Sequence, residues 1–173
     1  MTGRSKFLSR GVLALAAALS LTVLPAAAQY SGYGSQSSAS FSLGSGEQFG
    51  KDYTVLSGRY GRFFVEQFEA SIGLELWRGN SPSIYKIIPE LRYVSATGQS
   101  FKPYAAVFLS RTIYSNDVSS HNSYGVRGGL YYVLDRSAYI GAGLVHERQE
   151  SCDRAVMTDC NETRPEVTLH FRF

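Results

Sequence analysis

The strongest constraint on this chain is a strict alternation of apolar and polar residues, which residues 167–173 show most clearly. The apolar positions of this stretch are Val167, Leu169, Phe171 and Phe173. A β-strand sends successive side chains to opposite faces, so this stretch has one apolar face and one polar face. In a soluble protein an apolar edge strand invites aggregation. A strand that closes a membrane barrel has its apolar face on lipid and both edges paired, and the pattern favours that structure.

Seven more runs of this kind precede the last one, and each is bounded by turn residues. The eight predicted strands are residues 38–44, 53–64, 68–78, 83–95, 101–114, 122–134, 138–148 and 163–173. Most approach the ~9–11 residues that a tilted strand needs to cross a bilayer. We therefore predict an all-β protein, an eight-stranded antiparallel up-and-down transmembrane barrel with three short turns and four longer loops.

The two faces of these strands differ in charge. The polar faces carry Arg59, Glu69, Glu75, Lys86, Glu90, Arg92, Arg127, His170 and Arg172. The opposite faces are almost uncharged apart from Arg62, Arg78 and Arg111 near strand ends. A soluble lipocalin-like barrel has the reverse arrangement, so a membrane barrel with a polar interior is favoured. An eight-stranded barrel is just wide enough for side chains to fill, which favours a structural network over a gated ion path.

Aromatic residues gather at both predicted strand ends, as expected for two interfacial girdles. One end has Phe64, Phe68, Tyr93, Phe101, Tyr132, Phe171 and Phe173, and the other has Tyr53, Tyr85 and Tyr124. Pro89 falls in the middle of a predicted strand, where it donates no ladder hydrogen bond. We expect a β-bulge there.

Residues 58–74 and 128–134 resemble the general bacterial outer-membrane β-barrel (porin-like) family, and the alternating final strand resembles the C-terminal assembly signal of such proteins. The resemblance is one of pattern and covers nearly the whole chain after residue 28. It implies a small eight-stranded outer-membrane barrel, recognition by the barrel-assembly machinery through Phe173, and no single activity.

Residues 1–28 have the features of a secretory signal peptide cleaved after Ala28. Three basic residues precede an apolar run at 11–24, which is shorter than the ~20 residues of a spanning helix. The predicted barrel domain is then 29–173. Losing three of the seventeen basic residues leaves fourteen, equal to the acidic count, so charge gives no reason to expect a nucleic-acid partner.

Cys152 and Cys160 lie in the last long loop. In a secreted protein we expect them to form a disulfide bond, since two thiols without a nearby histidine make a poor metal site. No nucleotide-binding loop, metal cluster or CxxC pair is present, so no cofactor is expected.

Two histidines are candidates for catalysis. His121 lies two residues before Ser123 and could activate its hydroxyl. Outer-membrane lipid A deacylases use a His-x-Ser arrangement followed by Asn and Ala, whereas Tyr124 and Gly125 follow here. His146 precedes Glu147 and Arg148, and we interpret these three as rim residues that meet lipopolysaccharide.

We therefore expect a monomeric, non-enzymatic barrel of the Gram-negative outer membrane, with a structural or surface-contact role. The partners that it would meet there are outer-membrane lipid and lipopolysaccharide. A lipid A- or phospholipid-modifying enzyme and a small pore are the alternatives.

Overall fold

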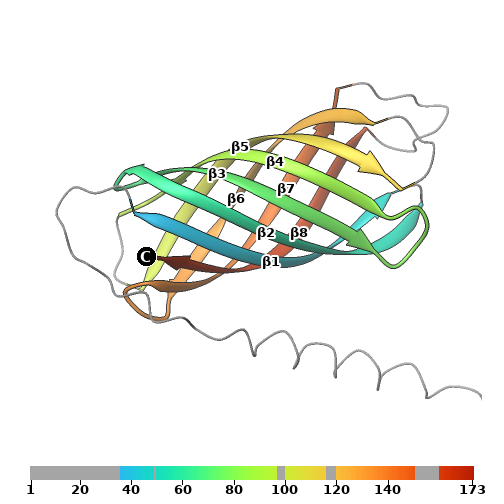
Figure 1. Cartoon of the computed structure of the whole chain (residues 1–173). Helices are drawn as coiled ribbons and strands as arrows, with labels where there is room; N and C mark the ends of the chain where they lie inside the picture. Colours follow the sequence, from blue (N-terminus) through green and yellow to red (C-terminus); the bar gives the residue numbers. More distant parts are fainter. Residues whose placement is uncertain (1–35, 49, 97–99, 116–119, 151–159) are drawn as a thin grey trace, which may run out of the picture. The chain divides into compact units, whose positions relative to one another are not determined.

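The computed structural model describes residues 36–48, 50–96, 100–115, 120–150 and 160–173. Eight antiparallel strands form a closed barrel, each paired with its neighbours in the sequence (Figure 1). The strands are β1 Ser37–Gln48, β2 Lys51–Val65, β3 Phe68–Arg78, β4 Ile84–Val94, β5 Phe101–Tyr114, β6 His121–Val133, β7 Ala138–Gln149 and β8 Asn161–Arg172. The predicted all-β, eight-stranded antiparallel fold is confirmed.

The barrel closes between β1 and β8, where Ser38 lies opposite Arg172 and Gly44 lies opposite Glu166. Ser37 and Phe173 exchange two backbone hydrogen bonds of 2.9 Å at the end of this seam. We call the end of the barrel that carries Ser37 and Phe173 the terminal end, and the opposite end the loop end. With every strand paired on both sides, no strand edge is left open.

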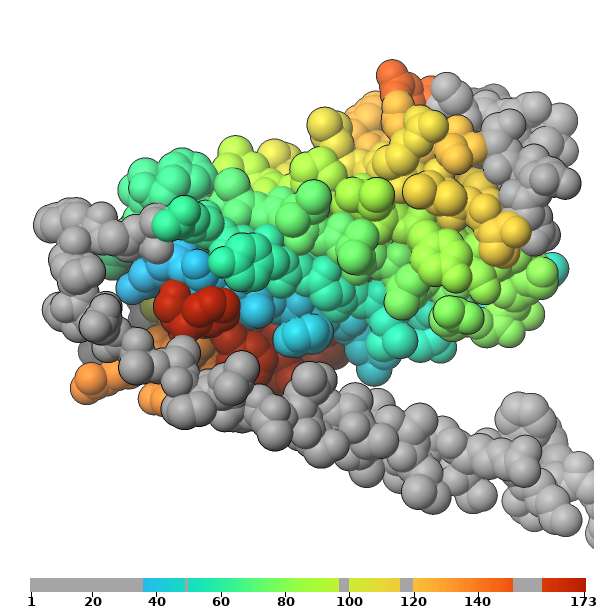
Figure 2. Space-filling model, in the orientation of Figure 1, coloured from blue at the N-terminus to red at the C-terminus, as the bar shows by residue number. Residues whose placement is uncertain are grey.

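Alternation places apolar side chains outside and charged ones inside. Leu74, Leu109 and Leu144 are each about three-fifths exposed on the outer surface, whereas the intervening positions are buried. On the side shown in Figure 2, the side chains of β2, β3 and β4 form a continuous outer wall. The lumen is therefore the place to look for a functional site.

The structure corrects three details of the sequence reading. β1 continues to Gln48, opposite Lys51, so the first loop-end connection has only two residues, with Gly50 at a φ of 65°. Residues 45–48 lack apolar alternation, and their backbone pairing with β2 extends the strand. Tyr53 is 2% exposed and packs inside against Trp77, so it does not belong to the aromatic girdle predicted with Tyr85 and Tyr124.

The β-bulge expected at Pro89 is also absent. The register of β4 on β5 is the same at Ile87, opposite Arg111, and at Glu90, opposite Phe108. The ladder to β5 has no paired residue at Ile88 and Pro89, yet it does not shift, and Pro89 stays in register with Ile72 of β3. Proline removes a donor but not the extended conformation. A register shift does occur in β2, between Phe63 and Val65, where this strand pairs with β3.

Candidate functional site

Five cations and five carboxylates are buried in the lumen. The cations are Arg59, Lys86, Arg92, Arg127 and Arg164, and the carboxylates are Glu69, Glu75, Glu90, Glu147 and Glu166. All ten are 6% exposed or less. Buried charge is costly unless it is paired, and the equal numbers allow full neutralisation. We call these ten residues the lumen network.

Glu90 of β4 is at the centre of the network, with three arginines around it. Arg92 donates to Glu90 Oε1 through Nη2 at 2.6 Å and Nε at 3.0 Å. Arg127 Nε of β6 and Arg59 Nε of β2 lie 3.1 and 3.7 Å from Glu90 Oε2. Glu90 thus contacts an arginine of its own strand and one arginine each of β2 and β6, neither of which pairs with β4.

Glu166 and Glu69 complete this central cluster. Arg127 donates to Glu166 of β8, whose other oxygen accepts from Tyr104 Oη at 3.3 Å. Glu69 of β3 accepts from Ser38 and lies 3.5 Å from Arg92 Nη1. The central cluster therefore contains three arginines and three glutamates whose contacts cross the interior.

A second cluster lies closer to the loop end. Glu147 accepts from Lys86 Nζ at 2.7 Å, and from Ser123 Oγ and Ser110 Oγ at 2.5 and 2.8 Å. Arg164 Nη2 donates to both oxygens of Glu75 at 2.7 Å. Because both groups are charged, such a hydrogen bond is stronger than one between neutral groups.

Trp77 holds the second cluster together. Its Nε1 donates to Glu75 Oε1 at 2.7 Å. Lys86 Nζ and the Arg164 guanidinium lie 4.6 and 5.1 Å from the ring centre, within the range of cation–π attraction. The single tryptophan of the chain therefore attracts both cations of this cluster.

Seven of the eight residues predicted for a lumen network lie in it: Arg59, Glu69, Glu75, Lys86, Glu90, Arg92 and Arg127. Arg172, the eighth, differs. Its Nη2 donates to the backbone oxygen of Glu66 at 3.2 Å, its guanidinium lies 3.9 Å from the Phe63 ring centre, and it makes no ion pair with a described residue.

Sequence reasoning missed Glu147, Arg164 and Glu166. The interpretation of Glu147 as a rim residue is wrong, because it is 3% exposed and faces inward. Residues 168, 170 and 172 face inward. Counting back from them in steps of two reaches Glu166 and Arg164, so the alternation of the last strand could have predicted both.

Among the described residues, neither candidate histidine forms a hydrogen bond with Ser123. Tyr114 Oη lies 3.3 Å from His121 Nδ1, whereas the hydroxyl of Ser123 is bonded to Ser110 and Glu147. His146 faces outward, and its Nδ1 lies 2.8 Å from Thr163 Oγ1.

Cys152 and residues 1–28 lie outside the described residues, so the disulfide with Cys160 and the signal peptide stay predictions. Within the described ranges, no group of three or more His, Cys, Asp or Glu side chains is placed to hold a metal ion. The same part of the chain contains no helix that is long and apolar enough to cross a membrane.

No family model and no curated protein matches this chain. Solved structures do match. The N-terminal β-barrel domain of Pseudomonas aeruginosa OprF has a TM-score of 0.60 at 16% identity, covering 81% of this chain and 100% of that one. Neisserial surface protein A has a TM-score of 0.59 at 14% identity, covering 80% and 97%.

A structure from the de novo design of transmembrane β-barrels is also similar, with a TM-score of 0.54 at 9% identity, covering 80% of this chain and 95% of that one. At such identities the likeness concerns the fold alone. The chain has the closed eight-stranded antiparallel fold of outer-membrane β-barrels.

Proposed function

We propose that this protein is a non-enzymatic barrel of the bacterial outer membrane, with a structural or surface-contact role and a lumen filled by the lumen network. The observation that carries the proposal is the distribution of charge: ten paired ionisable side chains inside, and an apolar outer wall. Inward charge and outward apolar residues suit lipid outside and polar packing inside.

The contacts across the lumen support a structural role over a pore. Arg59, Glu90, Arg127 and Glu166 come from β2, β4, β6 and β8, and ion pairs link them in a ring. Because these strands alternate around the barrel, the ion pairs span the interior. An eight-stranded barrel leaves little space beside such side chains.

The contacts of Ser123 and the histidines support a non-catalytic role. A serine nucleophile needs a base within hydrogen-bond reach. The carboxylate that Ser123 Oγ contacts, at 2.5 Å, is that of Glu147, which also accepts from Lys86 and Ser110. In the described part of the chain, no hydrogen bond joins Ser123 to His121 or His146. Lipid modification by His121 or His146 is the alternative.

Lipopolysaccharide and outer-membrane lipid are the proposed partners of the outer surface. Arg111 and Arg148 are exposed near the loop ends of β5 and β7, on either side of Tyr124 in β6. Guanidinium groups suit phosphate, and an aromatic ring suits the interface. We further propose a monomer, delivered by the barrel-assembly machinery through its recognition of Phe173.

The test uses cells that produce the wild type, His121→Ala or His146→Ala, with lipid A and phospholipids analysed by mass spectrometry. We expect all three strains and a strain without the protein to have the same lipids. A modified lipid that depends on the protein and disappears in either variant would establish the enzyme instead.

The pore alternative is tested on the purified folded protein in planar bilayers. We expect no stepwise conductance from the wild type. Steady unitary currents that change when Glu90→Gln removes the central carboxylate would show that the lumen conducts.

A further inference from the structure

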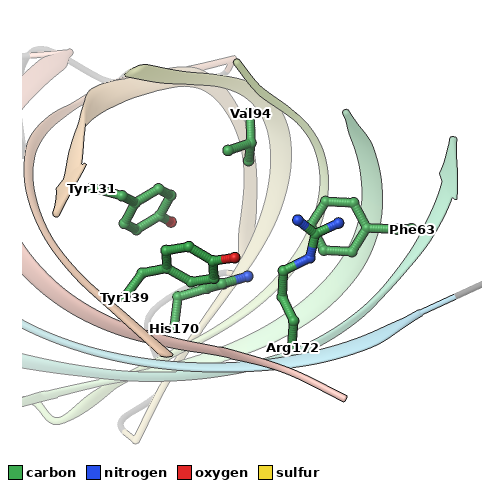
Figure 3. Close-up of a pocket in the computed structure, with 6 residues that line it drawn as sticks. All are labelled: Phe63, Val94, Tyr131, Tyr139, His170 and Arg172. Carbon is green, nitrogen blue, oxygen red and sulfur yellow. The ribbon is translucent and has the colours of Figure 1, made fainter. Parts of the chain in front are cut away.

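A small pocket lies inside the terminal end of the barrel, apart from the lumen network's ion pairs. Its lining consists of Phe63, Val94, Tyr131, Tyr139, His170 and Arg172 (Figure 3). It has a volume of about 10 Å³, which is at the lower limit of the space that one water-sized group needs. No carboxylate is among the lining residues.

His170 directs a hydrogen-bond donor toward this pocket. Its Nδ1 lies 3.5 Å from Arg92 Nη1. A guanidinium donates only, so Nδ1 accepts and the proton of the neutral ring is on Nε2. The side chain is 2% exposed, and its Nε2 is buried without a hydrogen-bond partner among the described residues.

Arg172 supplies a second donor without an acceptor. Its Nη2 is bonded to the backbone oxygen of Glu66, but its buried Nε has no partner in the described part of the chain. The guanidinium rests on the Phe63 ring, which restricts where Nε can point. Figure 3 shows a nitrogen of His170 and the guanidinium of Arg172 directed toward the space between them.

The cations nearest the pocket differ in how they are neutralised. Arg92, beside His170, is paired with Glu69 and Glu90. Lys102 Nζ lies 5.6 Å from the ring centre of Tyr139, which also lines the pocket. The hydroxyl of Tyr139 donates to the backbone oxygen of Arg136 at 3.2 Å. Neither Lys102 nor Arg172 forms an ion pair with a described residue.

From this geometry we propose that the terminal-end pocket binds a small anion, held by His170 Nε2–H and Arg172 Nε–H. Two buried donors on residues that line one pocket need an acceptor, since an unsatisfied buried donor is costly. The excess of cations makes a negative acceptor better than a neutral one. The pocket size limits the ligand to a halide ion or the end of one carboxylate group.

The test measures the imidazole ¹⁵N and ¹H signals of His170 in the full-length barrel, folded in detergent micelles. Sodium bromide and sodium formate are titrated separately, with ionic strength held constant by a bulky sulfonate salt. We expect the Nε2–H form of the ring and a saturable shift of its signal. Bromide alone would identify a halide site, and formate alone a carboxylate site.

Arg172→Gln tests the second donor, and Arg62→Gln is its matched control, because Arg62 is an exposed outward-facing arginine of β2. Losing a charge-assisted bond should weaken binding by roughly tenfold or more in Arg172→Gln and leave Arg62→Gln unchanged. His170→Phe keeps an aromatic ring against Phe63 and should abolish bromide binding, which is followed by the line width of the bromide signal.

Three results would overturn the site. One is an Nδ1–H ring, because the donor would then face Arg92. Another is a linear response to both salts, which would mean that the pocket holds water only. The third is equal binding by Arg172→Gln and Arg62→Gln when both variants are shown to be folded by their gel mobility before boiling.

Discussion

Glu147 of β7 lies directly opposite Glu162 of β8, and the two carboxylates have very different surroundings. Glu147 is bonded to Lys86, Ser110 and Ser123. Both carboxylate oxygens of Glu162 are buried and have no hydrogen-bond partner among the described residues. Like charges directly opposite each other on neighbouring strands are destabilising.

Glu162→Gln should therefore raise the free energy of unfolding by about 0.2–1 kcal/mol, because it removes one charge of a repulsive pair. Glu147→Gln should lower it by about 3–5 kcal/mol, because Lys86 then loses its carboxylate while remaining buried. Guanidinium unfolding in lipid vesicles measures both. Equal destabilisation by the two substitutions would show that Glu162 is as well paired as Glu147.

Glu90→Gln should be among the most destabilising changes in the central cluster. The amide cannot neutralise Arg59, Arg92 and Arg127, and breaking a buried ion pair by removing one partner costs about 3–5 kcal/mol. Glu47→Gln, at an exposed position of β1, is the control and should change the free energy of unfolding by less than about 0.5 kcal/mol. A similar small effect for both would mean that the arginines are neutralised in another way.

Alternation in the sequence was enough to predict the two faces of the barrel, because a period of two decides the side on which each residue falls. Leu109 outside and Glu90 inside follow from it directly. It was not enough for the end of β1, where residues 45–48 have no apolar pattern and the backbone ladder to β2 decides the strand.

The contacts of the lumen network also depend on information that the alternation lacks. Arg127 and Glu166 are 39 residues apart and meet because the closed barrel brings β6 and β8 to a common level across the lumen. Which cation meets which carboxylate depends on the stagger between strands, which no single strand encodes. Sequence reasoning could therefore predict most of the members of the network but not their pairing.

Val107→Arg should show whether the outer wall of β5 faces lipid. Val107 is 56% exposed in the middle of β5, and arginine at the bilayer midplane costs about 2–4 kcal/mol in a membrane barrel. Ile113→Arg, near the loop end of the same strand, should cost about 0–1 kcal/mol. Unfolding in vesicles measures both, and equal small costs would place the middle of β5 in water.

Deleting Phe173 should reduce assembly of the barrel, because its backbone closes the β1–β8 seam through two hydrogen bonds with Ser37. Phe173→Ala keeps those bonds and loses only the aromatic side chain, so it should be less impaired. The amount of folded protein in the outer-membrane fraction measures both. Normal levels of the deletion variant would show that the seam closes without this residue.

Gel mobility before and after boiling tests most directly whether the closed barrel is a membrane protein. The protein is folded in detergent or lipid and run in dodecyl sulfate with and without heating. We predict that the unheated protein migrates at a different apparent size, because a fully paired barrel resists the detergent. A single mobility, in protein shown by circular dichroism to have folded as β-sheet, would contradict the membrane barrel.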